Sequence, residues 1–163
     1  MKKILIVYFS VYGSTKKFAE IIGKEINADI IEIIPEAKYN DNPSHYEELA
    51  SYTKKEQEEN KRPKIKNSIS INDYDMIFVG YPIWWYTLPQ ILFTFFDEYN
   101  FSGKTIIPFN THEGSGSSGT YEEIKKLEPK ATVLEGLAIR GSNINQKVEN
   151  EIKKWLQKLN LIK

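Results

Sequence analysis

The chain has 163 residues, the usual size of one domain, and mixes apolar, aromatic and charged residues in ordinary globular proportions. Its 22 basic and 22 acidic side chains cancel, so electrostatics favour neither a nucleic acid nor an anionic membrane as partner. The absence of cysteine excludes disulfides, thiolate metal sites and cysteine nucleophiles. No apolar run approaches the ~20 residues of a membrane span. We therefore expect a single cytoplasmic domain over residues 1–163.

The N-terminal part of the chain changes from a strand pattern to a helix pattern and back. Residues 4–9 are almost continuously apolar and rich in branched side chains, which is typical of a strand buried on both faces of a parallel sheet. Residues 14–26 repeat apolar side chains at helical spacing, and residues 30–34 form a second strand that ends at Pro35. This succession of strand, helix and strand indicates an α/β fold.

The long polar segment that follows is harder to assign. Its residues 46–59 have a helix-forming composition with few apolar side chains, and we expect an exposed crossover helix there. The charged run at residues 54–59 is interpreted as a solvated helix face rather than as a binding patch.

The second half of the chain returns to regular alternation. We expect strands at residues 76–80, 104–109 and 131–134, and helices at 90–98, from about 120 onward and at 145–159. Thr120 and Glu123 have the spacing of a capping box, so Thr120 is the expected N-cap. Five strands alternating with helices predict a doubly wound five-stranded parallel sheet, whose ligands bind beyond the carboxyl ends of the strands. A site is therefore expected in the loops after the first, third and fourth strands.

The loop after the first strand, residues 10–16, combines hydroxyl side chains with a glycine directly before a helix. Free N–H groups and the dipole at a helix start suit a phosphate, and hydroxyl donors from Ser10, Ser14 and Thr15 add little charge. Gly13 permits close approach of the backbone. A helix cap with a tight turn explains the same residues and stays open as the alternative. The loop matches neither the Walker pattern nor the three spaced glycines of dinucleotide-binding folds.

The loop after the third strand contains three consecutive aromatic residues, Trp84, Trp85 and Tyr86, between Pro82 and Pro89. Aromatic faces and a rigid apolar wall that excludes water suit a flat heterocyclic ligand. A corner of the hydrophobic core and a protein–protein surface are the alternatives. Because adjacent aromatic side chains in a loop do not all point into one core, we favour the ligand.

The loop after the fourth strand, residues 110–119, is rich in glycine and small hydroxyl residues, which present backbone donors and acceptors to a ligand. It also contains His112. With two histidines in the chain and no cysteine, a transition-metal site is not expected. We interpret His112 as a surface or hydrogen-bonded residue, with a catalytic or redox-tuning role as the alternative.

Five segments together resemble the flavodoxin family, and within it short bacterial flavodoxin-like proteins. They are residues 8–16, 80–85, 101–105, 111–116 and 136–141, and they span almost the whole chain in the expected order. The resemblance implies a sheet in the order 2-1-3-4-5 with FMN bound noncovalently at the strand ends. It places the FMN phosphate on Ser10, Tyr12, Gly13, Ser14 and Thr15. It places the isoalloxazine ring between two sets of residues, which are Pro82, Ile83, Trp84, Trp85 and Tyr86, and Thr111, His112, Glu113, Gly114 and Ser115.

Three functions remain open at this point. The first, which we expect, is an FMN electron carrier that serves redox partner proteins, a reductase and an acceptor, without a catalytic side chain of its own. The second is an FMN-dependent reductase that passes electrons from NAD(P)H to a quinone-type substrate, with His112 or Tyr86 over the ring. The third is a cofactor-free binding or regulatory module of the same fold. The neutral charge weakens the electrostatic argument for a low-potential carrier, since such carriers are usually acidic. The oligomeric state stays open.

Overall fold

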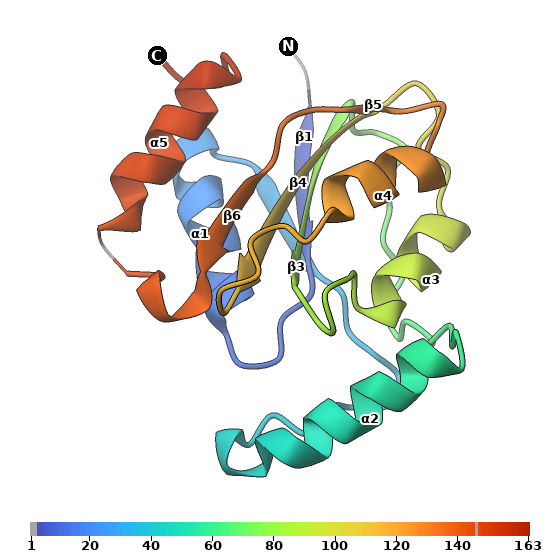
Figure 1. Cartoon of the computed structure of the whole chain (residues 1–163). Coiled ribbons are helices and arrows are strands. Elements are labelled where there is room, and N and C mark those ends of the chain that lie inside the picture. Colours follow the sequence, from blue (N-terminus) through green and yellow to red (C-terminus); the bar gives the residue numbers. More distant parts are fainter. Residues whose placement is uncertain (1–2, 146) are drawn as a thin grey trace.

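The computed structural model describes residues 3–145 and 147–163, and its centre is a parallel β-sheet (Figure 1). The strands are β1 (Ile4–Tyr8), β2 (Asp29–Glu32), β3 (Met76–Pro82), β4 (Thr105–His112), β5 (Thr132–Val133) and β6 (Leu137–Arg140). They lie in the order β2-β1-β3-β4-β5, and β6 pairs with β4 further along that strand than β5 does. The doubly wound α/β fold and the order 2-1-3-4-5 are confirmed.

Four helices cover the two faces of this sheet. α1 (Ser14–Ile26) and α5 (Val148–Lys158) lie on one face, and α3 (Gln90–Glu98) and α4 (Thr120–Leu127) lie on the other (Figure 1). The fifth helix, α2 (Tyr46–Glu58), runs along the carboxyl edge of the sheet. In the described ranges, no helix combines the length and the apolar composition that crossing a membrane requires.

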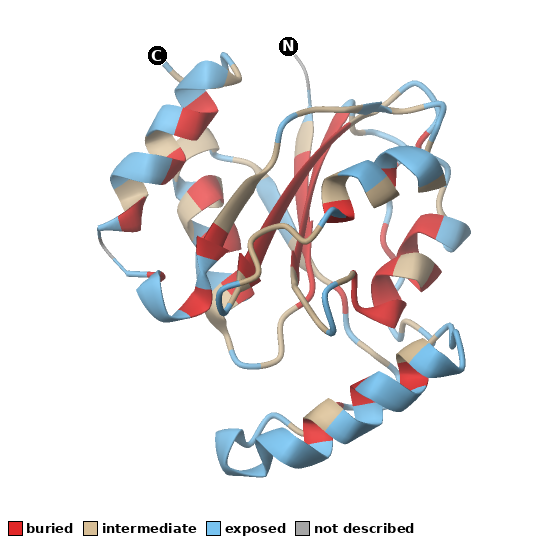
Figure 2. Cartoon of the chain, in the orientation of Figure 1, coloured by how far each residue is buried: buried red, intermediate tan, exposed pale blue. Residues whose placement is uncertain are grey.

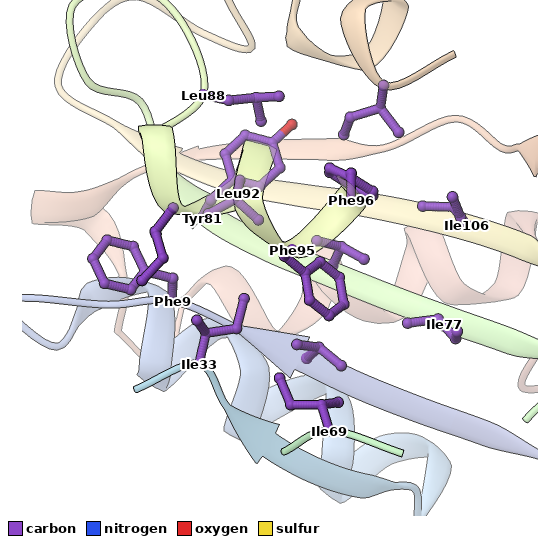
Figure 3. Packing of buried hydrophobic residues seen from close by; sticks show 14 of the residues in the cluster. Phe9, Ile33, Ile69, Ile77, Tyr81, Leu88, Leu92, Phe95, Phe96 and Ile106 are labelled. Atoms are coloured by element: carbon purple, nitrogen blue, oxygen red, sulfur yellow. The ribbon is translucent and has the colours of Figure 1, made fainter. Parts of the chain in front are cut away.

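The sheet is buried on both faces, as its continuously apolar strands predict. On the face covered by α1 and α5, Trp155 packs against both Phe18 of α1 and Phe78 of β3. On the opposite face, a second cluster is built around Phe95 of α3 (Figure 3). Phe9 continues this cluster to the carboxyl edge, so the loops there stand on a packed base.

β4 is longer than the sequence pattern predicts. It continues through Asn110 and Thr111 to His112, because β6 pairs with it at these positions. The expected fifth strand at residues 131–134 is shorter than predicted, since β5 has two residues, and β6 is a further strand that the five-stranded prediction did not include. The sequence pattern did not indicate β6, because Ile139 is the one buried residue of its four.

The start of α4 at Thr120 is confirmed, but its expected capping box and the expected start of α5 were wrong. The capping box is not formed, because Gly119, with φ 71°, is the N-cap of α4 and has the positive φ that glycine adopts easily. The hydroxyl of Thr120 instead donates to Ser117 O at 2.6 Å. α5 begins at Val148 rather than near residue 145.

α2 is largely exposed, as its polar composition predicts (Figure 2). Its buried residues are Leu49, Thr53 and Glu56. The expected crossover helix is therefore confirmed, but its charged run is not wholly solvated. The carboxylate of Glu56 accepts a hydrogen bond from Tyr39 OH at 2.9 Å, which satisfies the buried acid.

Candidate functional site

The first loop (residues 10–15), between β1 and α1, is closed by its own hydrogen bond. Gly13 has φ 101°, and its N–H donates to Ser10 Oγ at 3.1 Å. α1 starts at the next residue, and no described residue accepts a hydrogen bond from the backbone N–H groups of residues 14–16. Three free donors at the positive end of a helix make a ready anion site.

The two hydroxyl residues that begin α1 contact the ends of neighbouring strands. Thr15 Oγ1 lies 2.8 Å from Thr111 Oγ1 of β4, and both side chains are buried. Ser14 Oγ lies 3.5 Å from Gly141 O, directly after β6. A hydroxyl has one donor and two acceptor positions, so Thr15 keeps capacity for an anion beside its bond to Thr111.

The aromatic loop (residues 82–87) turns back on itself at Trp85 and Tyr86. Trp84 and Thr87 exchange two backbone hydrogen bonds, each of 3.1 Å. The two residues between them have φ of 53° and 62°, a combination that tight hairpin turns require and that Asn and Gly adopt most easily. Two aromatic residues in this conformation store backbone strain, which proteins keep mainly at functional sites.

The three aromatic side chains of this loop point in different directions, as expected. Trp84 packs edge-on against Tyr39 of the core, with 5.3 Å between ring centres. Trp85 is turned toward α2, where its Nε1 donates to Thr53 Oγ1 at 3.1 Å. Tyr86 is 76% exposed. Only the first of the three belongs to the core, so the other two are available for a ligand.

The third loop (residues 113–119) is shaped at its start by His112. Nδ1 of His112 accepts a hydrogen bond from Gly114 N–H at 2.9 Å, which requires a neutral ring. Burial, and after it the Arg140 guanidinium, hold the pKa of His112 below its ordinary value, against the opposing effect of Glu113. His112 therefore acts as a neutral acceptor within the loop.

A buried polar network anchors the other end of the third loop. Asn110 is fully buried, and its Nδ2 donates to Gly116 O at 3.0 Å while its Oδ1 accepts from Tyr121 OH at 2.6 Å. Tyr81 OH lies 2.8 Å from Thr120 Oγ1. Burial raises the pKa of Tyr121 far above its usual range, so this hydroxyl stays a donor. A fully bonded buried network is rigid, and it presents the loop in one conformation.

A cavity of about 500 Å³ opens between these loops and α2. Its lining is Tyr12, Tyr46, Leu49, Ala50, Thr53, Ile83, Trp84, Trp85, Tyr86, Glu113, Gly114 and Ser115. The volume lies in the range of cofactor sites, and aromatic walls with a few polar groups suit a flat heterocyclic ring. Among the described residues, no group of His, Asp and Glu side chains is arranged to hold a metal ion.

The structure divides the predicted site residues into three groups. Tyr12, residues 83–86 and residues 113–115 line the cavity, so the first loop contributes Tyr12 to the same space as the aromatic loop. Ser10 and Gly13 line a second hollow of about 460 Å³, on the β2 side of the first loop. The lining of these two spaces does not include the remaining predicted residues, which are Ser14, Thr15, Pro82, Thr111 and His112.

The sequence interpretation missed two parts of the site. The first is α2, whose Leu49, Ala50 and Thr53 line the cavity. The available signal was a narrow apolar stripe in a charged helix, too narrow for a helix that covers a sheet face. The second is the end of β6, where Arg140 lies so close to Gly114 that a Cβ there would stand 3.1 Å from its Nη2.

Comparison with known proteins agrees with this geometry. The sequence matches the flavodoxin family over residues 3–159. The structure is similar to that of a candidate flavoprotein from Bacteroides eggerthii, with TM-score 0.83, 33% identity and 96% and 97% of the two chains covered. The structure of a candidate flavoprotein from Bacteroides uniformis is similar with TM-score 0.82 and 30% identity, and the match covers 96% of this chain and 98% of that chain.

A third similar structure is that of a flavoprotein from Lactobacillus acidophilus in complex with FMN. It gives TM-score 0.74 and 25% identity, with 95% of this chain and 99% of that chain covered. No curated protein is significantly similar in sequence. Because the family match covers nearly the whole chain and the fold and strand order agree with it, this protein belongs to the flavodoxin family.

Proposed function

We propose that this protein binds FMN and carries electrons between redox partner proteins, a reductase that supplies them and an acceptor that takes them. The observation that carries the proposal is the combination of a free anion site at the start of α1 with an aromatic cavity of about 500 Å³. A single ligand with a phosphate at one end and a flat ring system at the other suits both. The FMN complex of the Lactobacillus acidophilus flavoprotein supports the same cofactor here.

The residues present fit FMN in their donor chemistry. The backbone N–H groups of residues 14–16, with the hydroxyls of Ser10, Ser14 and Thr15, would hold the phosphate, and the space around the Gly13 Cα is open to it. Residues 83–86 and 113–115 would enclose the ring and exclude water. Bound FMN supplies the redox chemistry, because it accepts electrons and returns them.

The polar side chains around the cavity favour a carrier over an enzyme with its own substrate. His112, the candidate acid or base, is a neutral acceptor for Gly114 N–H and is not part of the cavity lining. The carboxylate of Glu113 is directed toward Gly141, where an added Cβ would stand 2.6 Å from Oε1. His112 is therefore committed to the loop, and Glu113, although it lines the cavity, has its carboxylate beside Gly141, which supports simple electron transfer.

Two measurements on the purified protein test the proposal. We expect flavin absorbance in the isolated protein or tight uptake of added FMN. Protein that stays colourless in excess FMN would instead support the cofactor-free module. With FMN bound, anaerobic mixing with NADH or NADPH is expected to give slow reduction unless a separate reductase is added. Rapid stoichiometric reduction by the nucleotide alone would overturn the carrier and favour the NAD(P)H-dependent reductase.

A further inference from the structure

α2 has a position that the packing of the sheet does not demand. It runs along the carboxyl edge, apart from the helices on the two faces (Figure 1), and most of its surface faces solvent (Figure 2). Its buried residues are Leu49, Thr53 and Glu56, of which two are polar. A helix with so little apolar burial gains little free energy from the core, so its place at the edge requires another reason.

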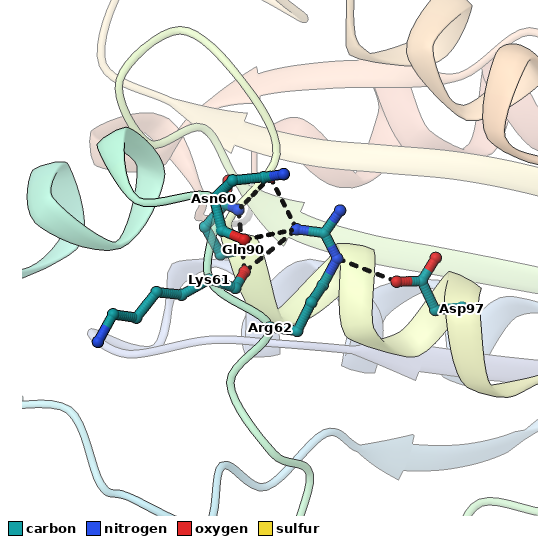
Figure 4. Close-up of polar contacts among 5 residues, drawn as sticks. All are labelled: Asn60, Lys61, Arg62, Gln90 and Asp97. Carbon is teal, nitrogen blue, oxygen red and sulfur yellow. Dashed lines mark hydrogen bonds and ion pairs between the residues drawn. The ribbon is translucent and has the colours of Figure 1, made fainter.

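The C-terminal end of α2 is tied to α3 by a polar network (Figure 4). Arg62 donates from Nη1 to Asn60 Oδ1 and from Nε to Asp97 Oδ2, both at 2.9 Å. Gln90, the first residue of α3, donates from Nε2 to Lys61 O at 3.0 Å. This end of the helix is therefore fixed to the body of the protein, and the helix extends from it along the cavity.

The middle of α2 contacts the aromatic loop. Trp85 Nε1 donates to Thr53 Oγ1 at 3.1 Å and to Ala50 O at 3.2 Å. The Thr53 hydroxyl itself donates to Leu49 O at 2.9 Å, so an oxygen lone pair is left for the indole N–H. Lys54 Nζ lies 5.2 Å from the centre of the Trp85 ring. α2 therefore holds the indole of a residue whose backbone has the unfavourable φ of 53°.

The N-terminal half of α2 forms a wall of the cavity. Tyr46, Leu49 and Ala50 line it together with Tyr12 of the first loop and Gly114 of the third loop. The lining does not include the start of α1, where the free N–H groups lie. A bound ring would therefore contact α2, while a phosphate held at the start of α1 would not.

We propose that α2 is a ring-binding wall of the flavin site, in which Leu49 and Ala50 contact the isoalloxazine and Thr53 positions Trp85. This inference rests on the proposed function, because the ring is that of FMN. It extends the site beyond the loops that follow the strands, and it accounts for a sparsely buried helix at the carboxyl edge. Because the contacts involve the ring and not the phosphate, a change in α2 alters the affinities for FMN and riboflavin by the same factor.

Two neighbouring substitutions test whether α2 borders the ring. Ala50→Phe fills the cavity from α2, whereas Ser51→Phe places the same side chain at an exposed position of the helix. We expect Ala50→Phe to weaken both FMN and riboflavin at least ~100-fold, measured by quenching of flavin fluorescence, and Ser51→Phe to change both less than about twofold. An Ala50→Phe protein that binds both flavins like the wild type would overturn the inference.

Deletion of one hydroxyl and its rescue test the positioning role of Thr53. Thr53→Val keeps the shape of the side chain but removes one of the two acceptors of Trp85 Nε1 and leaves Ala50 O, and Thr53→Ser restores the lost acceptor. We expect both flavins to bind about tenfold more weakly to the valine variant and to recover with serine. A loss confined to FMN, or an equal loss in the two variants, contradicts the positioning role.

Hydrogen exchange distinguishes failure of this inference from failure of the proposed function. Added FMN or riboflavin is expected to slow the exchange of wild-type amides in residues 46–54. If the wild type binds flavin and these amides exchange as before, α2 is not a wall of the site and FMN binding stands. If the wild type binds no flavin, the proposed function and this inference both fail.

Discussion

Thr15 and Thr111 meet hydroxyl to hydroxyl, 2.8 Å apart, at a buried point where the start of α1 touches β4. The two residues are separated by 96 positions in the sequence. Thr15 belongs to the anion site, and Thr111 lies in the strand that leads into the third loop. Their contact therefore joins the phosphate part and the ring part of the proposed site.

Substitutions at Thr15 and at Thr111 test separately how this contact affects the stability of the fold and how it affects FMN binding. Thr15→Val and Thr111→Val each remove the hydrogen bond, and each is expected to lower the free energy of unfolding by about 1 kcal/mol in urea titrations. Thr15 alone stands at the anion site, so Thr15→Val is expected to weaken FMN about tenfold and to leave riboflavin unchanged. An equal loss of FMN in both variants would show that the hydroxyl pair acts through structure alone.

Strain at the tip of the aromatic loop is expected to make a glycine variant more stable than an alanine variant. Tyr86 has φ 62°, a conformation that glycine adopts without a steric cost. Tyr86→Gly is expected to have a free energy of unfolding roughly 0.5 to 1 kcal/mol above that of Tyr86→Ala, measured in urea. The alanine variant is the matched control, because it loses the same ring and keeps the strained backbone. Equal stability of the two variants would mean that this position stores no strain.

Arg140 is expected to contribute to the lowered pKa of His112. Burial contributes most to holding the pKa of His112 below its ordinary 6.5, and the Arg140 guanidinium adds to it. Arg140→Gln removes the second cause, so the pKa of His112 is expected to rise in an NMR titration of its ring protons. Lys126→Gln, on the exposed surface of α4, is the control and is expected to leave the pKa of His112 unchanged. An unchanged pKa in Arg140→Gln would contradict the prediction.

The same histidine predicts how flavin binding depends on pH. Because the folded pKa of His112 is lowered, the stabilisation from its neutral ring is present above the ordinary pKa and is lost as the pH falls through the folded value. Protonation removes the acceptor for Gly114 N–H, so flavin affinity is expected to fall over that range. His112→Asn keeps an acceptor that does not titrate and is expected to flatten the fluorescence-derived affinity profile. A profile as steep as that of the wild type would assign the effect to another group.

Glu128, at the end of α4, is expected to destabilise the fold at alkaline pH. Burial, with a smaller effect from Asp97, raises its pKa from 4.5 to about 7. Since the folded pKa exceeds the unfolded value, the stability that this group contributes is present below the unfolded pKa and is lost as the pH rises through the folded one. Glu128→Gln is expected to raise the free energy of unfolding at about pH 8 by about 1 kcal/mol, after allowance for its partial exposure.

The comparison across pH decides this prediction. At about pH 4 the wild-type carboxyl is protonated, so Glu128→Gln is expected to have nearly wild-type stability there. Glu151→Gln, at an exposed position of α5, is the control at both pH values. A gain of equal size at the two pH values would point to a cause other than the titration of Glu128.

Most strands and helices were predictable because burial on both faces of a sheet leaves a regular apolar pattern in the chain. β1 and β3 show it as continuous apolar runs, and α1 shows it as helical periodicity. The polar end of β4 was not predictable in this way. Asn110 and Thr111 lie in a strand because β6 pairs with them, and that pairing joins Asn110 to Ala138, far along the chain, without a local signal.

The loops of the candidate site were predictable from the sequence, but their side-chain contacts were not. The sequence placed the first, aromatic and third loops at one edge of the sheet, because turn residues and apolar runs mark where strands end. It did not show that Tyr12 lines the same cavity as Trp85, or that the Thr15 hydroxyl meets Thr111. Such side-chain contacts depend on the path of each loop after its strand.

By itself, then, the sequence determined the α/β fold class and the three loops at the carboxyl edge, and its family resemblance supplied the strand order. These features rest on local periodicity, turn chemistry and motifs that each segment carries alone. Only the tertiary structure decided that α2 closes the cavity, through Thr53 and Trp85, and that Arg140 stands beside His112. Those contacts join segments far apart in the chain, and their free energy depends on packing and hydrogen bonding that no local pattern records.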